Sequence, residues 1–298
     1  PNGCRQSPIN VLMVIFLLLF ANCVRIITKG TTPTMYVISH IVVLIIYIGI
    51  LVSWGMSVYD RIVHKSIRRY LVILMGLMMF WMLMRTLRHT VFLHVFPVGQ
   101  WCWYAYYIPM ILIPQFCFLA MKYVGKPEDY HMPKIWHIIN IPSVILILGI
   151  LTNDLHQWAF RFHQGYVAGW DVYQRGFLYN AAVVWVFICI AMMLTEVIKN
   201  CRVPGTHKVI WRPIAMLGIG VLYTVLYTID TALFSFIEMT AALCFTVVAI
   251  WESCIKTGLI PSNTHYNELL EYSGLGERSG KNGKRYRYRS ERSSRKSY

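Results

Sequence analysis

Long runs of apolar residues constrain this chain more than any other feature of its sequence. Each run is close to the roughly 20 residues that a helix needs to cross a bilayer. The seven runs lie at residues 35–57, 70–94, 101–123, 134–152, 176–198, 210–228 and 233–254. Apolar residues follow one another without the alternation of barrel strands, and a helix satisfies its own backbone polar groups, as hydrocarbon requires. The sequence therefore predicts an all-α, polytopic membrane bundle with seven core transmembrane helices.

An eighth apolar run lies near the N-terminus, at residues 8–27. It is longer than the usual core of a signal peptide, and no small-residue cleavage site follows it. We expect an extra hydrophobic helix that spans or anchors, with a signal-peptide core as the alternative. The expected domains are this helix and an outer linker, the seven-helix bundle, a linker helix and a basic tail, at residues 1–34, 35–254, 255–276 and 277–298.

The charges of the connections between the runs predict their orientation. Every second connection is rich in lysine and arginine, namely 58–70, 122–134 and 199–208. The alternate connections at 96–100 and at Asp230 carry no basic residue, and at 153–175 two arginines are balanced by two aspartates. Because basic connections concentrate on the cytoplasmic side of a membrane, the C-terminus is expected in the cytoplasm and the 153–175 connection outside.

The composition agrees with a membrane protein and shows where the excess charge lies. Of the residues, 57% are hydrophobic and 14% are charged, a balance that excludes an ordinary soluble domain. The formal net charge is +15, and residues 277–298 hold nine basic residues against two glutamates. We expect this tail to be disordered and to lie on anionic lipid of the cytoplasmic leaflet. Its position at a membrane surface disfavours nucleic acid as a partner.

The sequence contains no HExxH, GxSxG or Walker phosphate-binding motif, so we expect neither catalysis nor a cofactor. Gly218 and Gly220 are interpreted as positions of close helix packing. The eight cysteines show no CxxC spacing, and five fall within the seven core runs. These five are interpreted as small buried hydrophobic residues.

Charged residues inside the apolar runs are the first candidates for function, because a charge in hydrocarbon is costly. Arg85 lies about 22 Å along its run, in the outer half of the membrane, with Arg88 just above it. Glu238 is expected about one helical turn into the last run, and Asp230 at the same boundary. These residues could form an outward-facing ligand pocket or a relay. The alternatives are an ion pair that orients the helices, or an arginine that reaches to the surface.

The run at 101–123 begins with a cluster of aromatic residues, among which Tyr107 is a candidate ligand contact. An aromatic belt at the membrane interface accounts for most of the cluster. Pro109 and Pro114 lie further along the same run, and each removes a helical hydrogen bond. We expect helix kinks at both prolines, which would open space beneath the outer surface.

The connection at 152–176 is the longest polar insertion within the body of the chain. His156 and His163 are near two aspartates, but their spacing matches no strong metal motif. We therefore expect no metal and keep His156 as a candidate ligand-binding residue. The aromatic residues of this connection could form an interfacial lid or line a ligand site.

Residues 258–276, GLIPSNTHYNELLEYSGLG, form the junction between the apolar body and the basic tail. Gly258 and Pro261 are expected to end the preceding helix, and Asn263 with its neighbours to cap a new one. With Tyr266, these residues mark the predicted signalling linker.

Several segments resemble the N-terminal seven-helix membrane region of bacterial sensor histidine kinases. The resemblance covers about residues 35–276. Its most specific segments are LTNDLHQ at 151–157 and GLIPSNTHYNELLEYS at 258–273, with support from RIVHKSIRRYL at 61–71, GKPEDYHMPKIW at 125–136 and CRVPGTHKVIWRP at 201–213. It implies a sensory input region in the bacterial cytoplasmic membrane, which passes a stimulus through its last helix to a cytoplasmic output module.

In such kinases the membrane region continues into cytoplasmic modules that include a phospho-acceptor helix and an ATP-binding domain. After Gly276 this chain reads ERSGKNGKRYRYRSERSSRKSY, which contains neither. We therefore expect no enzyme, and interpret the chain as a standalone or truncated input domain or as the product of a reading-frame change. The implied partners are a cytoplasmic kinase or response regulator, a small-molecule or membrane stimulus, the lipid bilayer and a second copy in a homodimer. The alternative function is a small-solute transporter or channel, although no internal repeat supports it.

Overall fold

The computed structural model describes residues 33–260 except 93–94, 96, 163–172, 201–210 and 230–237. The long helices are α2 (Pro33–Arg61), α3 (Lys65–His89), α4 (Val98–Met121), α5 (Asn140–Leu151), α7 (Phe177–Asn200), α8 (Trp211–Ile229) and α10 (Met239–Lys256). The shorter elements are the 3₁₀-helix η1 (Lys134–Ile139), which leads into α5, and α6 (Asn153–His156), β1 (Phe160–Arg161) and β2 (Gln174–Arg175), which precede α7.

Six helices of the described chain are long and apolar enough to cross a membrane when η1 and α5 are taken as one span. α8 adds a shorter apolar stretch at Trp211–Tyr227. Apolar side chains cover the outside of the bundle as well as its inside, as expected of helices that lie in hydrocarbon. The prediction of an all-α bundle of membrane helices is confirmed, with six full-length spans and one shorter helix. The two short strands, which pair antiparallel, were not predicted.

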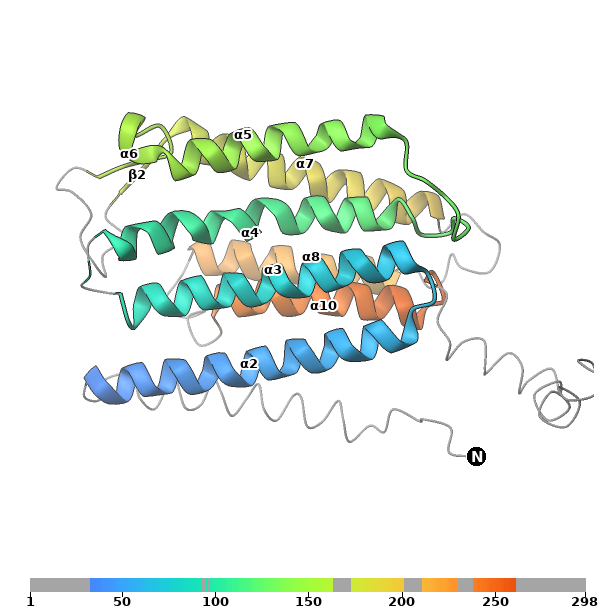
Figure 1. The fold of residues 1–298 in the computed structure, drawn as a ribbon, viewed down its shortest axis with the longest axis horizontal. Helices are drawn as coiled ribbons and strands as arrows, with labels where there is room; N and C mark the ends of the chain where they lie inside the picture. The colour runs from blue at the N-terminus through green and yellow to red at the C-terminus, as the bar shows by residue number, and fades with distance from the viewer. Residues whose placement is uncertain are drawn as a thin grey trace, which may run out of the picture.

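The long helices run alternately in opposite directions, so their connections gather at two ends (Figure 1). One end holds the α2–α3 and α4–η1 connections and the last turns of α7 and α10, and it carries most of the basic residues. It is termed the basic end. The opposite end, termed the loop end, holds α6, β1 and β2 with the first turns of α4, α7 and α10. The charge alternation along the sequence therefore corresponds to two opposite ends of one bundle.

Two predicted helix boundaries need correction. α3 spans Lys65–His89 instead of 70–94, because its basic first turns stay helical while their long side chains reach toward water. α10 begins at Met239, and Glu238 precedes it in an extended conformation with φ −69° and ψ 127°. Glu238 therefore lies at the start of the last helix and not one turn inside it. Apolar residues continue across this point of the sequence, so composition did not reveal the boundary.

α4 is the central helix and packs against α3, α5 and α7. Towards the basic end its buried residues join a large cluster with α2, α3 and α10, which includes Phe118 and Trp251. At the loop end they join a second cluster with α5, α7 and the connection before α7. α4 runs through Pro109 and Pro114 as one uninterrupted helix, and a kink at either proline stays a prediction.

The aromatic residues at the start of α4 are mostly inside the protein. Trp103, Tyr104 and Tyr107 are buried, whereas Trp101 is half exposed. Phe160 of β1 lies against the three buried rings because the chain after α6 folds back over them. The interpretation as an aromatic belt is therefore wrong for these three residues.

The paired glycines of α8 differ in their surroundings. A Cβ atom on Gly220 would lie 2.5 Å from Cγ2 of Thr246 in α10, whereas a Cβ atom on Gly218 would meet open space. The prediction of close helix packing is confirmed for Gly220 and wrong for Gly218. The five cysteines of the described helices are buried, as predicted, and they form no disulfide among the described residues: Cys102, Cys117, Cys189, Cys244 and Cys254.

Candidate functional site

A polar cluster joins three helices at the loop end. Arg85 of α3 forms an ion pair with Glu238, and its Nη1 donates a hydrogen bond of 3.0 Å to Oγ1 of Thr240 in α10. The hydroxyl of Tyr106 in α4 lies 3.2 Å from the same Oγ1 atom. Thr240 is fully buried, so the cluster lies within the protein. Arg85 and Glu238 do lie at similar depth, while Asp230 is outside the described residues.

The cluster satisfies the charges that the sequence places in the outer part of the bundle. An ionised side chain away from water is tolerated when it is paired and hydrogen-bonded. Arg85 has a carboxylate and a hydroxyl as partners, and these belong to the start of the last helix. The arrangement is therefore an ion pair that fixes the start of α10 against α3.

Arg88 lies near Arg85 in sequence but contacts different residues. Its guanidinium carbon is 3.5 Å from the ring centre of Trp103. Trp103 in turn contacts Phe160 and Tyr173 of the connection before α7. Tyr107 contacts the same Phe160 ring. Arg88 and Tyr107 therefore belong to an aromatic cluster that holds the loop end onto α4.

A second hydrogen-bond network at the loop end was missed in the sequence. The Tyr104 hydroxyl donates to Oδ1 of Asp154 at 2.6 Å, and Gln100 Nε2 donates to the same oxygen at 2.6 Å. Asn153 Nδ2 donates to the Tyr104 hydroxyl at 3.3 Å. The network joins the first turns of α4 to α6.

Asn153 also fixes the backbone after α6. Its Oδ1 accepts hydrogen bonds from the backbone N–H groups of Ala159 and Phe160, at 2.9 and 3.0 Å, and its Nδ2 donates to the Phe160 carbonyl at 3.0 Å. Between Asn153 and Ala159 the chain reverses direction at Gln157, whose φ is 53°. The Asn-Asp pair in LTNDLHQ was a signal for this role, because such side chains often bond to nearby backbone in turns.

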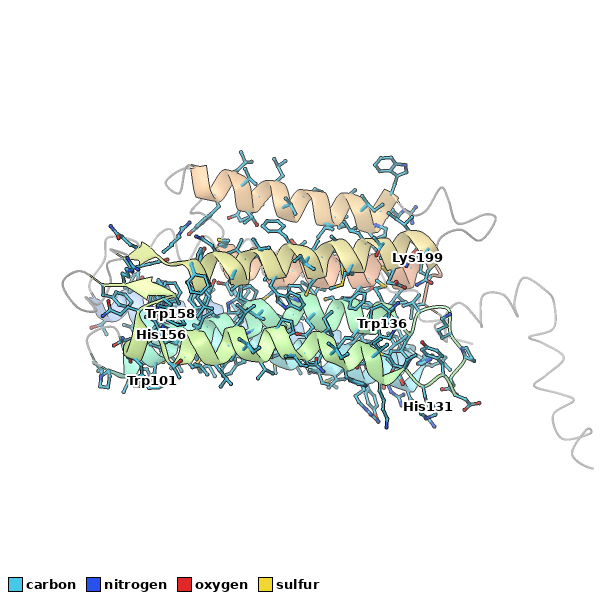
Figure 2. The ribbon with its side chains drawn as sticks, turned by 90° about the horizontal axis from the view of Figure 1, so that it is seen from above. Trp101, His131, Trp136, His156, Trp158 and Lys199 are labelled. Atoms are coloured by element: carbon cyan, nitrogen blue, oxygen red, sulfur yellow. The ribbon has the colours of Figure 1, made fainter. Side chains whose placement is uncertain are left out.

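His156 is held by its immediate neighbours. Its Nδ1 accepts a hydrogen bond of 3.0 Å from the Trp158 backbone N–H, and its Nε2 lies 3.3 Å from Oγ1 of Thr152. Figure 2 shows His156 beside Trp158 at the loop end, with Trp101 close by. Both ring nitrogens contact residues of the turn that contains His156. The structure does not bring His156 to Arg85. The described residues include no group of three or more His, Cys, Asp or Glu that could hold a metal ion.

At the basic end a second ion pair holds α10, and sequence reasoning also missed it. Arg61, in the last turn of α2, pairs with Glu252 of α10, and its Nη1 lies 3.3 Å from Oε2. Trp54 Nε1 donates to Oε1 of the same glutamate at 3.0 Å. Glu252 lies within the last apolar run, whereas Arg61 lies in a basic connection, where topology alone accounts for a charge.

The last turn of α10 lies close to this ion pair. The helix ends at Lys256, and Gly258 has a φ of 73°, which glycine adopts without the steric cost of a Cβ. The Ile260 N–H donates to the Cys254 carbonyl at 3.3 Å, and Ile260 is fully buried. The chain is therefore held against the bundle up to residue 260. Pro261, Asn263 and Tyr266 are outside the described residues.

A third charged group at the basic end does not involve α10. Lys122 after α4 and Lys199 of α7 lie 3.0 and 3.2 Å from Oε1 of Glu196 in α7. Lys122 also lies 3.7 Å from the ring centre of Trp136. Figure 2 shows Lys199 and Trp136 at the end opposite His156. This group connects α4, η1 and α7.

α4, α7, α8 and α10 surround a cavity of ≈ 580 Å³. Its walls are mostly apolar side chains, among them Ile113, Phe187, Val221 and Leu243. Arg175 of β2 lies at its loop end, where the neighbouring Tyr179 raises the pKa of the guanidinium above its ordinary value. The sequence predicted open space near Pro109 and Pro114, and Pro114 lines this cavity. Its other walls were not predictable, because they depend on how α7, α8 and α10 pack.

Comparison with known families supports the assignment that these features suggest. The profile of the family described as the N-terminal 7TM region of histidine kinase matches residues 35–260. The match includes the LTNDLHQ segment and both ion pairs of α10. No curated protein and no solved structure matches the chain. Because the match covers most of the sequence, the chain belongs to the family of N-terminal seven-transmembrane regions of histidine kinases.

Proposed function

We propose that this chain is the sensory input region of a bacterial two-component signalling system and passes its signal through α10 to a cytoplasmic output module. One observation carries the proposal. α10 is the last helix in the matched region, and ion pairs near its two ends join it to two different helices, α3 and α2. A change in the packing of either helix therefore alters the balance of forces on α10 and on the segment that follows it.

The proposed orientation places the basic end in the cytoplasm of a bacterial cell. The connections at this end and the first turns of α3 carry Arg61, Lys65, Arg68, Arg69, Lys122, Lys126 and Lys134. Lysine and arginine at membrane-flanking positions favour the cytoplasmic side. On this orientation the chain after Gly258 enters the cytoplasm, where a kinase or response regulator would receive the signal.

The loop end is then the side that receives the stimulus. We assign Arg85 and Glu238 the role of a relay, since their ion pair joins the start of α10 to α3 and, through Thr240, to α4. Arg88 and Tyr107 would transmit a change in the connection before α7, because both contact its aromatic cluster. His156 would act by holding the shape of that connection.

The proposal is tested in a chimera of residues 1–276 with the phospho-acceptor and ATP-binding domains of a histidine kinase, reconstituted in lipid vesicles. Glu252→Gln removes the charge that binds Arg61. We expect it to change the autophosphorylation rate at least about fivefold, the lower range of measured coupling between sites. Size-exclusion profiles would show that the variant still folds.

Glu196→Gln is the matched control. Glu196 is also an ion-paired glutamate at the basic end, but its partners lie on α7 and just after α4. We expect the output of this variant to equal that of the unmodified chimera. Equal responses of the two variants, or no response of either, would contradict transmission through α10.

A further inference from the structure

The cavity beside α10 is elongated along the bundle. Its lining extends from Tyr179 to Met193 on α7 and from Met239 to Trp251 on α10. At 1.5 Å of rise per residue, these stretches run for about 20 Å along the bundle. One extended hydrocarbon chain fits lengthwise along such a lining.

The cavity opens on the apolar outside of the bundle. Val184 and Phe187 of α7 line it and are 57% and 56% exposed. Val221 and Val225 of α8, on the opposite wall, are 39% and 47% exposed. Side chains that both line the cavity and reach the surface mark an opening between α7 and α8. In a bilayer this opening faces lipid, so a ligand would arrive through the membrane and not from water.

The charged and amide side chains that line the cavity lie at its loop end. Arg175 and Asn180 are exposed there, and the guanidinium carbon of Arg175 lies 5.2 Å from the ring centre of Tyr179. Among the described residues no carboxylate forms an ion pair with Arg175. A cation and an amide at one end of an apolar channel are complementary to an anionic head group with a hydrocarbon tail.

We propose that this cavity binds a single-chain anionic amphiphile of the fatty-acid type, with its head group at Arg175 and its chain between α7, α8 and α10. The ligand enters sideways from the bilayer. Because α10 forms one wall of the cavity, occupancy presses directly on the helix that leads to Gly258. This consequence for signalling rests on the function proposed above, whereas binding itself does not.

The binding test uses the full chain in lipid nanodiscs and a 16-carbon fatty acid with a photoactivatable group near the end of its chain. Mass spectrometry of the crosslinked peptides identifies the labelled residues. We expect labelling of lining residues on α7 and α10, such as Val183 and Leu243. Val221→Trp fills part of the cavity and should abolish this labelling. Leu222→Trp is its control, because Leu222 is exposed and does not line the cavity.

The head-group assignment is tested with two arginines of the same strand pair. Arg175→Gln should weaken binding of the fatty acid about fivefold, as expected for loss of an exposed ion pair. Arg161→Gln should leave binding unchanged, because Arg161 does not line the cavity. A neutral alcohol with the same number of carbons cannot form the ion pair. Its affinity for the unmodified protein should therefore equal the affinity of the fatty acid for the Arg175→Gln variant.

Three results would overturn the inference. The first is uniform labelling of the lipid-facing surface that Val221→Trp does not change, which indicates ordinary boundary lipid. The second is equal labelling of the cavity by a diacyl phosphatidylglycerol with the same photoactivatable group, which would assign the site to bilayer lipid. The third is no labelling of the lining residues at all. The chimera separates this inference from the proposed function, because its Glu252→Gln response does not depend on any ligand.

Discussion

The two ends of α10 are held in different ways. At the loop end Glu238 pairs with Arg85 of α3, and the buried Thr240 next to it connects the pair to Tyr106 of α4. At the basic end Glu252 pairs with Arg61, and its second partner, Trp54, belongs to the same helix α2. The start of α10 is therefore fixed to two helices and its last turns to one.

This difference indicates which end moves more readily. A shift of α10 at the loop end must disturb a network that joins α3, α4 and α10. A shift at the basic end breaks only the contact of Glu252 with Arg61 and Trp54, which joins α10 to α2. α2 otherwise packs mainly on α3. We therefore expect the loop end to act as the anchor and the basic end to act as the contact that releases the output segment.

The largest expected effect comes from breaking the anchor. Glu238→Ala removes the carboxylate partner of the partly buried Arg85. It should destabilise the protein by about 3 kcal/mol or more, because loss of a partner costs a charged group more than the roughly 1–3 kcal/mol that it costs a neutral one. Glu252→Ala should cost less, about 1–2 kcal/mol, because Arg61 lies at the end of its helix and can reach water. Denaturant unfolding in detergent compares the two. Equal losses would show that the two ends are fixed alike.

A smaller effect is expected from the connection that covers the loop end. Asn153→Ala removes three hydrogen bonds to the backbone around Ala159 and Phe160. We expect a loss of about 2–3 kcal/mol, since buried backbone groups are left without partners. Asn180→Ala, at an exposed position of α7, is the control and should unfold as the unmodified protein does. An unchanged midpoint for Asn153→Ala would show that this connection does not support the anchor.

The smallest effect concerns the middle of α10. Gly220→Ala places a methyl group against Thr246 and should cost about 1–2 kcal/mol through overpacking between α8 and α10. Gly218→Ala meets open space and should be neutral or slightly stabilising. Thermal unfolding of the two variants under identical conditions gives the comparison. A larger loss for Gly218→Ala would place the contact between these helices elsewhere.

The helices were predictable because hydrocarbon imposes one simple rule. A run of about 20 apolar residues can cross the membrane only as a helix or as part of a barrel, so composition alone located the spans. The start of α10 was not predictable, because the residues on both sides of Glu238 are apolar and no change of composition marks where the helix begins.

The site was predictable only where a charge stood out in an apolar run. Arg85 and Glu238 were found in this way, and the structure pairs them. The pair of Arg61 and Glu252 was missed because Arg61 lies in a basic connection outside the apolar runs, where membrane topology alone accounts for a charge. Asn153 was missed because its backbone partners lie six and seven residues further on, so the Asn-Asp pair signalled a turn but not the residues that it holds.

The ion pair of Arg61 and Glu252 is proposed to control the output segment, and a charge exchange in the kinase chimera tests this proposal. Arg61→Glu and Glu252→Arg each place like charges together and should shift autophosphorylation in the same direction. The double variant restores an opposite pair. We expect the double variant to return to the rate of the unmodified chimera. A double variant that departs from it as far as the single variants, or single variants that leave the rate unchanged, would contradict the claim.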